Sequence, residues 1–221
     1  MGNRAVITTS ERRLALYLHW NGGRDSVEAF LAYCKLCGFR SPDADEYGWA
    51  RLAQVICNFM GADGLSVGIS RYTTDERENP GDNGIYVVKG WEIVERIYPY
   101  APFEEQQEYP LADMLKDIDA AQPEDQRLVA FLDAEEVPVA SVGVGDEVFM
   151  REVGGRWAPF PVAGFGDGRV VNGLDTEGVP YVRMYAEYGP AEDNVSNYLR
   201  TPTVRRVKKE GWPWRESDTS S

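Results

Sequence analysis

The sequence predicts an α+β fold in which an acidic helical stretch separates two parts. The first 98 residues combine two amphipathic helix patterns with runs in which apolar and polar residues alternate. After residue 142, several short β-prone runs are separated by glycine and proline, a pattern typical of small barrels and sandwiches. We therefore expect an N-terminal antiparallel sheet covered by two helices, followed by a C-terminal SH3-like β-barrel.

The first part begins with a hairpin and a helix. Residues 4–8 and 14–19 are β-prone and flank a polar turn, which predicts two antiparallel strands. Asp25 fits a helix N-cap, because Glu28 three residues later completes a capping box. Gly38 stands at the C′ position where this helix is expected to end.

A second helix pattern follows directly. Ser41 is its expected N-cap and Pro42 its first residue, since proline is common at the first helical position. Gly61 is expected to end it. The apolar stripe of this helix consists of Trp49, Leu52, Val55, Ile56 and Phe59.

The sequence then changes to the period of two that is typical of strands. Apolar residues alternate over 65–69, and residues 85–89 and 91–98 are strong strand candidates. Between them, residues 72–84 are polar and rich in glycine, proline and asparagine, which predicts a loop. This completes a predicted α+β domain over residues 1–98.

Residues 99–141 form the predicted connector. Two short helices fit there, over about 110–121 and 124–135. Acidic residues outnumber basic ones eleven to two between positions 99 and 136, so we predict an acidic surface that binds a partner. The candidate partner-binding residues are Glu104, Glu105, Glu108, Asp113, Asp117, Asp119, Glu124, Asp125, Asp133, Glu135 and Glu136.

Residues 142–210 form the predicted SH3-like barrel, and residues 211–221 form a tail. The phrase VGDEV, at positions 144–148, resembles the first strand of such barrels over about ten residues. The candidate strands of this part are residues 147–152, 161–165, 169–172, 179–185 and 203–208.

The formal net charge of −13 limits the classes of function. A protein that binds nucleic acid without regard to sequence needs a basic face. The only positive patch either binds an anion or pairs with the acidic connector; it consists of Arg200, Arg205, Arg206, Lys208 and Lys209. No apolar run approaches the roughly 18 residues that span a bilayer, and the N-terminus lacks an apolar signal core, so we expect a cytoplasmic protein.

His19 is the single histidine, which excludes H-E-x-x-H zinc sites and two-histidine iron sites. A small hydrolase centred on His19, Asn21 and Asp25 is one hypothesis. We favour a packed histidine at a strand end beside Trp20, and we predict no catalytic residue, no metal and no cofactor.

Other patterns are weaker candidates for ligand binding. Cys34 and Cys37 form a C-x-x-C pair, but it would close a helix, whereas redox pairs usually lie at a helix N-terminus. With Cys57, a three-thiolate zinc site is the alternative to buried structural thiols, which we favour. The turn 22–24 could hold an anion and the acidic segment 75–83 a calcium ion, but we favour a plain turn and a solvated loop.

Four segments resemble a family of small accessory proteins encoded by phages, plasmids and conjugative elements. They are MGNRA, YLHWNGGRDSVEAFLAYC, YGWARLAQVICNF and DNGIYVVKGWEIV, and they lie within the first 98 residues. The resemblance transfers no catalytic residue, because the family has none assigned. The resemblance implies that the protein is accessory cargo of a mobile element. Such cargo includes anti-CRISPR and antirestriction inhibitors, some of which mimic the charge of DNA.

These observations support three hypotheses. The first, which we adopt, is a non-enzymatic inhibitor of a host defence complex that binds a basic, nucleic-acid-handling protein surface through its acidic residues. The second is the small hydrolase centred on His19. The third is an adaptor whose barrel binds a peptide or nucleic acid through its aromatic residues and the basic patch.

Overall fold

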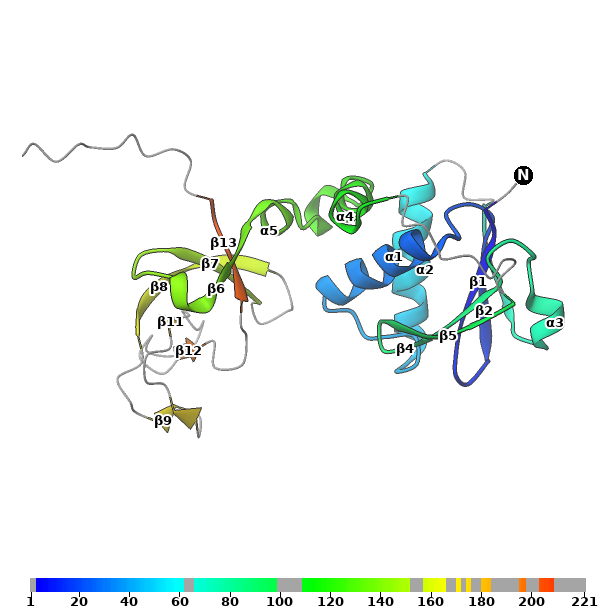
Figure 1. Cartoon of the computed structure of the whole chain (residues 1–221), viewed down its shortest axis with the longest axis horizontal. Coiled ribbons are helices and arrows are strands. Elements are labelled where there is room, and N and C mark those ends of the chain that lie inside the picture. Colours follow the sequence, from blue (N-terminus) through cyan, green and yellow to red (C-terminus); the bar gives the residue numbers. More distant parts are fainter. Residues whose placement is uncertain are drawn as a thin grey trace, which may run out of the picture. The chain divides into compact units, whose positions relative to one another are not determined.

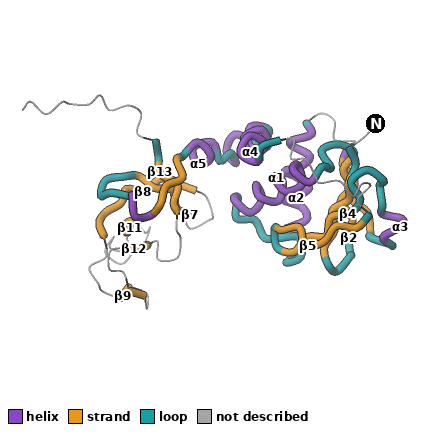
Figure 2. The backbone as a smooth tube through the Cα atoms, viewed as in Figure 1, coloured by secondary structure: helices purple, strands orange, loops and turns teal. Residues whose placement is uncertain are grey.

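The computed structural model of the chain contains two compact units, residues 1–129 (unit 1) and 130–221 (unit 2) (Figure 1). Helices and strands are both present, so the fold is α+β, as predicted (Figure 2). The structure describes residues 3–61, 66–98, 109–151, 157–165, 170–171, 174–175, 180–183, 195–197 and 203–208.

Unit 1 contains one five-stranded sheet, built from β1 (Ala5–Thr9), β2 (Leu14–Leu18), β3 (Val67–Arg71), β4 (Ile85–Lys89) and β5 (Glu92–Ile97). The strand order β3-β2-β1-β4-β5 places β1 in the centre, and all of its residues are buried. β1 pairs antiparallel with β2 but parallel with β4. The sheet is therefore mixed, and the prediction of an antiparallel sheet is wrong. Parallel neighbours need a long crossover, which the helices between β2 and β4 supply.

Two helices, α1 (Arg24–Leu36) and α2 (Glu46–Met60), lie on one face of this sheet (Figure 1). The N-cap of α1 is Gly23, not Asp25 as predicted, and no side chain caps this end. The Asp25 carboxylate instead accepts a hydrogen bond of 2.7 Å from the backbone N–H of Ser26. The other end agrees with the sequence, since Gly38 follows the helix with a φ of 72°.

α2 begins at Glu46 rather than at Pro42. Its N-cap is Asp45, whose carboxylate accepts a hydrogen bond of 3.1 Å from the backbone N–H of Gly48. The cause is tertiary packing: a Cβ atom on Gly48 would lie 2.2 Å from the carbonyl oxygen of Ser41. The chain before α2 therefore folds against its first turn instead of extending it.

The opposite face of the sheet has a core cluster of its own. Val6, Ala15 and Ile85 are buried there together with Tyr72, which follows β3. Tyr72 begins the segment 72–84, which the sequence predicted to be a loop. The segment is thus part of the packing of unit 1.

Segment 72–84 contains the short helix α3 (Asp75–Glu78), which the sequence analysis missed. Two arginines bind the segment to the sheet. Arg12 contacts Asp75 at 3.1 Å. Arg4 donates from Nε (2.9 Å) and Nη2 (3.1 Å) to the two carboxylate oxygens of Asp82, and its backbone N–H donates to the same group.

Helix α4 (Leu111–Ala120) also belongs to unit 1, where it contacts α1 and α2. Met114, Leu115 and Ile118 are buried, as its apolar pattern predicts. Leu111 at the start of the same stripe stays exposed.

The helix predicted over 124–135 is interrupted. A 3₁₀ turn covers Glu124–Gln126 and the short helix α5 covers Val129–Asp133. The acidic pair expected at the helix end instead begins strand β6 (Glu135–Pro138). A neighbouring strand from near the C-terminus pairs with β6, so the cause is a contact remote in sequence.

Unit 2 contains a six-stranded antiparallel sheet built from β6, β7 (Glu147–Arg151), β8 (Trp157–Phe165), β11 (Pro180–Arg183), β12 (Val195–Asn197) and β13 (Thr203–Arg206). The order is β12-β11-β8-β7-β13-β6, and within the described residues the two end strands do not pair to close a barrel. A separate pair is formed by β9 (Val170–Val171) and β10 (Leu174–Asp175). The buried cluster of unit 2 is Val137, Val142, Val148, Val162 and Val204.

Close packing at Gly84 gives a stability prediction. Gly84 has a φ of 70°, and a Cβ atom there would lie 2.2 Å from the carbonyl oxygen of Ile97. Gly90 also has a positive φ (60°), but a Cβ atom there meets nothing within 4 Å. Gly90→Ala should lower the free energy of unfolding by about 1 kcal/mol through backbone strain alone. Gly84→Ala should lower the free energy of unfolding clearly more, because its Cβ would also collide with the backbone of Ile97. Equal losses for the two variants in urea denaturation would contradict this close approach.

The Arg4–Asp82 pair gives a pH prediction. Hydrogen bonds from the side chain and backbone of Arg4 lower the pKa of Asp82 to about 2. A carboxylate with a lowered folded-state pKa adds stability above its unfolded pKa of about 3.9 and loses it as the pH falls toward the folded value. Asp82→Asn should therefore be less stable than wild type at neutral pH, with the difference shrinking between about pH 4 and pH 2. Thermal melts across this range check it, and a difference that is constant with pH would argue against the pair.

Candidate functional site

Four of the predicted partner-binding acids are exposed on unit 1. Asp113 and Asp117 lie on α4, and Glu124 and Asp125 lie on the 3₁₀ turn that follows. Asp117 accepts a hydrogen bond of 3.0 Å from the hydroxyl of Tyr109. Within the described residues, none of the four forms an ion pair with a lysine or arginine. We call these four residues the α4 acidic surface.

Asp119 has a different environment on the same helix. It is only 2% exposed. Its carboxylate accepts hydrogen bonds from the hydroxyl of Tyr33 on α1 (2.7 Å) and from the backbone N–H of Leu128 (2.6 Å). Burial, together with the hydrogen bond to Asp119, raises the pKa of Tyr33, so its hydroxyl stays protonated and donates. Asp119 thus joins α4 to α1 and is not available to a partner.

The acids of β6 in unit 2 pair with the basic patch that the sequence singled out. Arg206 contacts Glu135 at 2.9 Å and the buried Asp146 at 3.3 Å. Arg205 lies 3.9 Å from Glu136. β6 and β13 place these residues opposite each other, and opposite charges across a strand pair are stabilising. Pairing inside the molecule was one of the two alternatives for the basic patch.

Arg205 also holds α5 on the sheet of unit 2. Its guanidinium donates hydrogen bonds of 3.1 Å to the carbonyl oxygens of Phe131 and Leu132, at the C-terminal end of α5. It also lies 4.9 Å from the ring centre of Phe131, which in turn stacks on Trp157 with ring centres 4.3 Å apart. The guanidinium of Arg205 is therefore occupied by contacts that hold α5 in place.

The remaining predicted charges are placed as follows. Asp133 and Lys208 are exposed in unit 2. Glu104, Glu105, Glu108, Arg200 and Lys209 lie outside the described residues.

His19 is surrounded by aromatic groups rather than acids. Its Nδ1 atom lies 2.9 Å from the hydroxyl of Tyr17, and its ring meets that of Trp20 edge-on at 4.9 Å. Asn21 donates to the sulfur of Met60, and Asp25 accepts from its own neighbour in the chain. No hydrogen bond in the described part of the chain links His19 with Asn21 or Asp25.

The glycine turn after His19 is explained by packing. The backbone N–H of Gly22 donates to the carbonyl oxygen of Asn3 at 2.8 Å. A Cβ atom on Gly22 would lie 2.6 Å from the backbone nitrogen of Ala5. Only glycine permits the turn to lie this close to β1.

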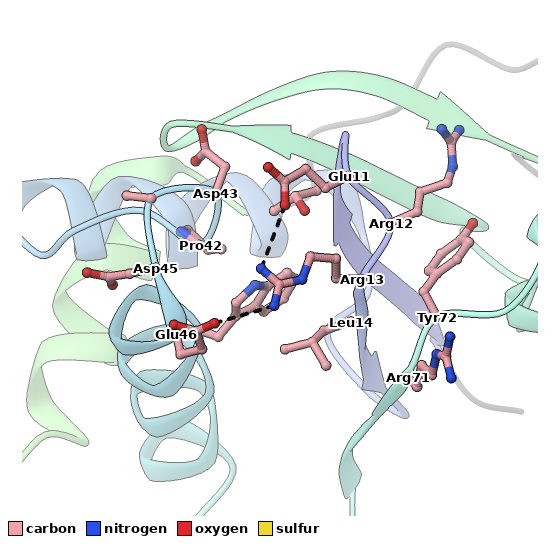
Figure 3. A pocket seen from close by; sticks show the side chains of 13 residues that line it. Glu11, Arg12, Arg13, Leu14, Pro42, Asp43, Asp45, Glu46, Arg71 and Tyr72 are labelled. Carbon is pink, nitrogen blue, oxygen red and sulfur yellow. Dashed lines mark hydrogen bonds and ion pairs between the residues drawn. The ribbon is translucent and has the colours of Figure 1, made fainter.

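A groove of about 790 Å³ opens on unit 1 between the β1–β2 turn, the chain before α2 and the end of β3 (Figure 3). Arg13 points into it and contacts Glu46 at 3.5 Å and Glu11 at 3.9 Å. Its apolar lining includes Leu14, Trp49 and Tyr72. Its walls carry both positive and negative side chains, so it can bind a polar group. Its lining comes from three segments that are distant in sequence, and the sequence analysis did not predict it.

The cysteines and acidic loop show no metal site. None of the three cysteines forms a disulfide, and burial raises the pKa of Cys34, which keeps it an unreactive thiol. Asp75 and Asp82, in the loop considered for calcium, are bound to arginines. Among the described residues there is no group of three histidine, cysteine, aspartate or glutamate side chains able to hold a metal. No helix in the described part is both long and apolar enough to cross a bilayer.

Comparison of the chain with family models, with curated proteins and with solved structures gave no match.

The two kinds of acid on α4 can be separated by mutation. Asp119→Ala would remove the carboxylate that accepts from the buried Tyr33 hydroxyl and from the Leu128 N–H, so we expect a loss of about 3 kcal/mol in the free energy of unfolding. Asp113→Ala, exposed on the same helix, should change it by no more than about 0.5 kcal/mol. Urea denaturation measures both, and a stable Asp119→Ala protein would contradict the structural role of this carboxylate.

Proposed function

We propose that the protein is a non-enzymatic interaction protein of a mobile element that acts in the host cytoplasm as an inhibitor of a defence complex, of the anti-CRISPR or antirestriction type. Its α4 acidic surface would occupy a basic protein surface that normally holds nucleic acid. The observation that carries this proposal is that these four carboxylates are exposed without a cationic partner among the described residues.

The contrast with the other acids of the connector supports this choice of residues. Glu135 and Glu136 face arginines across a strand pair, and Asp119 is buried in hydrogen bonds. The charge of the two glutamates is compensated within the molecule, and Asp119 is inaccessible to a partner. The carboxylates of the α4 acidic surface are exposed, and the net charge of −13 adds a long-range field of the same sign.

Electrostatic attraction of this kind has a characteristic salt dependence. Exposed charges act over a Debye length of about 10 Å at 0.1 M salt, and screening shortens that range as salt rises. Complementary charge mainly speeds association and fixes orientation. Binding of the basic partner should therefore weaken steeply with salt.

The two other hypotheses have less support. A hydrolase would need His19 within reach of an acid and a nucleophile, whereas its described partners are Tyr17 and Trp20. An adaptor that uses the basic patch would need Arg205 and Arg206, which are engaged in hydrogen bonds within unit 2. We keep the SH3-like arrangement of unit 2 as part of the proposal, supported by its antiparallel sheet around a valine cluster.

The test is binding to purified CRISPR effector and restriction complexes at low and at high salt. A variant in which the α4 acidic surface is neutralised should bind about tenfold more weakly or worse at low salt, because each exposed charge pair contributes up to about 1 kcal/mol. Its salt dependence should also be shallower. The substitutions are Asp113→Asn, Asp117→Asn, Glu124→Gln and Asp125→Asn.

A matched control removes the same number of charges elsewhere on unit 1. It should keep most of the affinity, which separates a local surface from net charge. Equal weakening of both variants, or wild-type binding that salt does not affect, would contradict the proposal. The control substitutions are Glu11→Gln, Glu46→Gln, Glu76→Gln and Glu92→Gln.

A further inference from the structure

Strand β3 forms one edge of the unit 1 sheet, and its hydrogen-bond register shows which of its backbone groups are used. The N–H of His19 donates to the carbonyl oxygen of Ser66, and the N–H of Tyr72 donates to that of Arg13. In an antiparallel pair, residues alternate between bonding to the partner and pointing away from it. Positions 66, 68, 70 and 72 therefore bond to β2.

The intervening residues Val67, Ile69 and Arg71 direct their N–H and C=O groups away from the sheet. β3 pairs with β2 alone, so within the described residues these groups have no partner. The pairing of β3 with β2 runs through five residues without a bulge. Such an edge is a template for another strand.

The other edge of the same sheet is protected. The pairing of β5 with β4 is interrupted by a bulge near Val88. Two charged side chains of β5 form ion pairs within unit 1, Glu92 with Lys35 and Glu95 with Arg12. A bulge and charged residues are the devices by which natural sheets block edge-to-edge pairing. β3 has no bulge, and its only charged residue is Arg71 at its end.

The side chains of β3 also suit a contact. Ile69 is 57% exposed at the middle of the strand. Residues 66–74 contain no acid and one base, Arg71, in a protein of net charge −13. The strand therefore carries no negative charge that would repel a second copy at this edge.

We propose that β3 pairs antiparallel with β3 of a second copy of the chain, around a two-fold axis at Ile69. This axis sets Ile69 opposite its counterpart and Val67 opposite Arg71, so all the outward N–H and C=O groups of the three residues on each copy are paired. The strand is thus complementary to itself, as a two-fold interface requires. The two sheets become one continuous sheet, and the exposed isoleucines cover each other.

The test is the mass of the intact protein in solution, measured by size-exclusion chromatography with light scattering over a range of concentrations. The wild type should have twice the 24.8 kDa mass of the chain. Ile69→Lys should restore the single mass, because two like charges would face each other across the axis. Ile69→Pro should do the same by removing an outward N–H that the monomer does not use.

Val94→Lys is the matched control, since Val94 on β5 is 55% exposed and lies at the protected edge. It should leave the dimer intact. Amide hydrogen exchange adds a direct readout: protection of Val67, Ile69 and Arg71 should rise with protein concentration and be lost in Ile69→Lys. A wild type that remains a monomer overturns the proposal and leaves the edge to a strand of another protein. A dimer that survives both Ile69 substitutions overturns it as well.

Discussion

The central position of β1 is the constraint on which the rest of unit 1 depends. Every residue of this strand is buried, and it bonds to an antiparallel neighbour on one side and a parallel one on the other. The parallel pairing requires the chain to leave and return in the same direction. The crossover places α1 and α2 on one face of the sheet and segment 72–84 on the other. It also leaves β3 and β5 as the two edges, of which only β5 is protected.

The acidic residues of the connector show how environment separates residues of the same type. Leaving a buried hydrogen-bonding group without its partner costs about 1–3 kcal/mol, whereas an exposed ion pair contributes about 0–1 kcal/mol. Asp119 belongs to the first kind and the α4 acidic surface contains only exposed carboxylates. Glu135 is intermediate, exposed but fixed opposite Arg206. A high count of acids in a sequence therefore overstates the charge that a partner can meet.

Local patterns in the sequence predicted what local forces determine. β4 coincides with its apolar run, and Gly61 ends α2 because the chain there needs a positive φ. Errors arise where distant segments meet, as in β6, and where the chain folds back on itself, as before α2. The groove of Figure 3 was missed for the same reason. Asp119 could have been recognised, because it lies four residues after Leu115 on the apolar stripe of α4, where a carboxylate indicates a buried partner.

The two proposals are linked, because dimerisation changes the number of acidic surfaces that one particle presents to a target. Each copy of unit 1 carries one α4 acidic surface, so pairing through β3 would give a dimer with two of them. Once one surface is bound to a target with repeated basic sites, the second binds at an effective concentration set by their separation rather than by the bulk solution. Individually weak electrostatic contacts would then produce tight binding. A target with a single basic site would gain nothing from the dimer, so such a dimer would favour repetitive assemblies over isolated basic proteins.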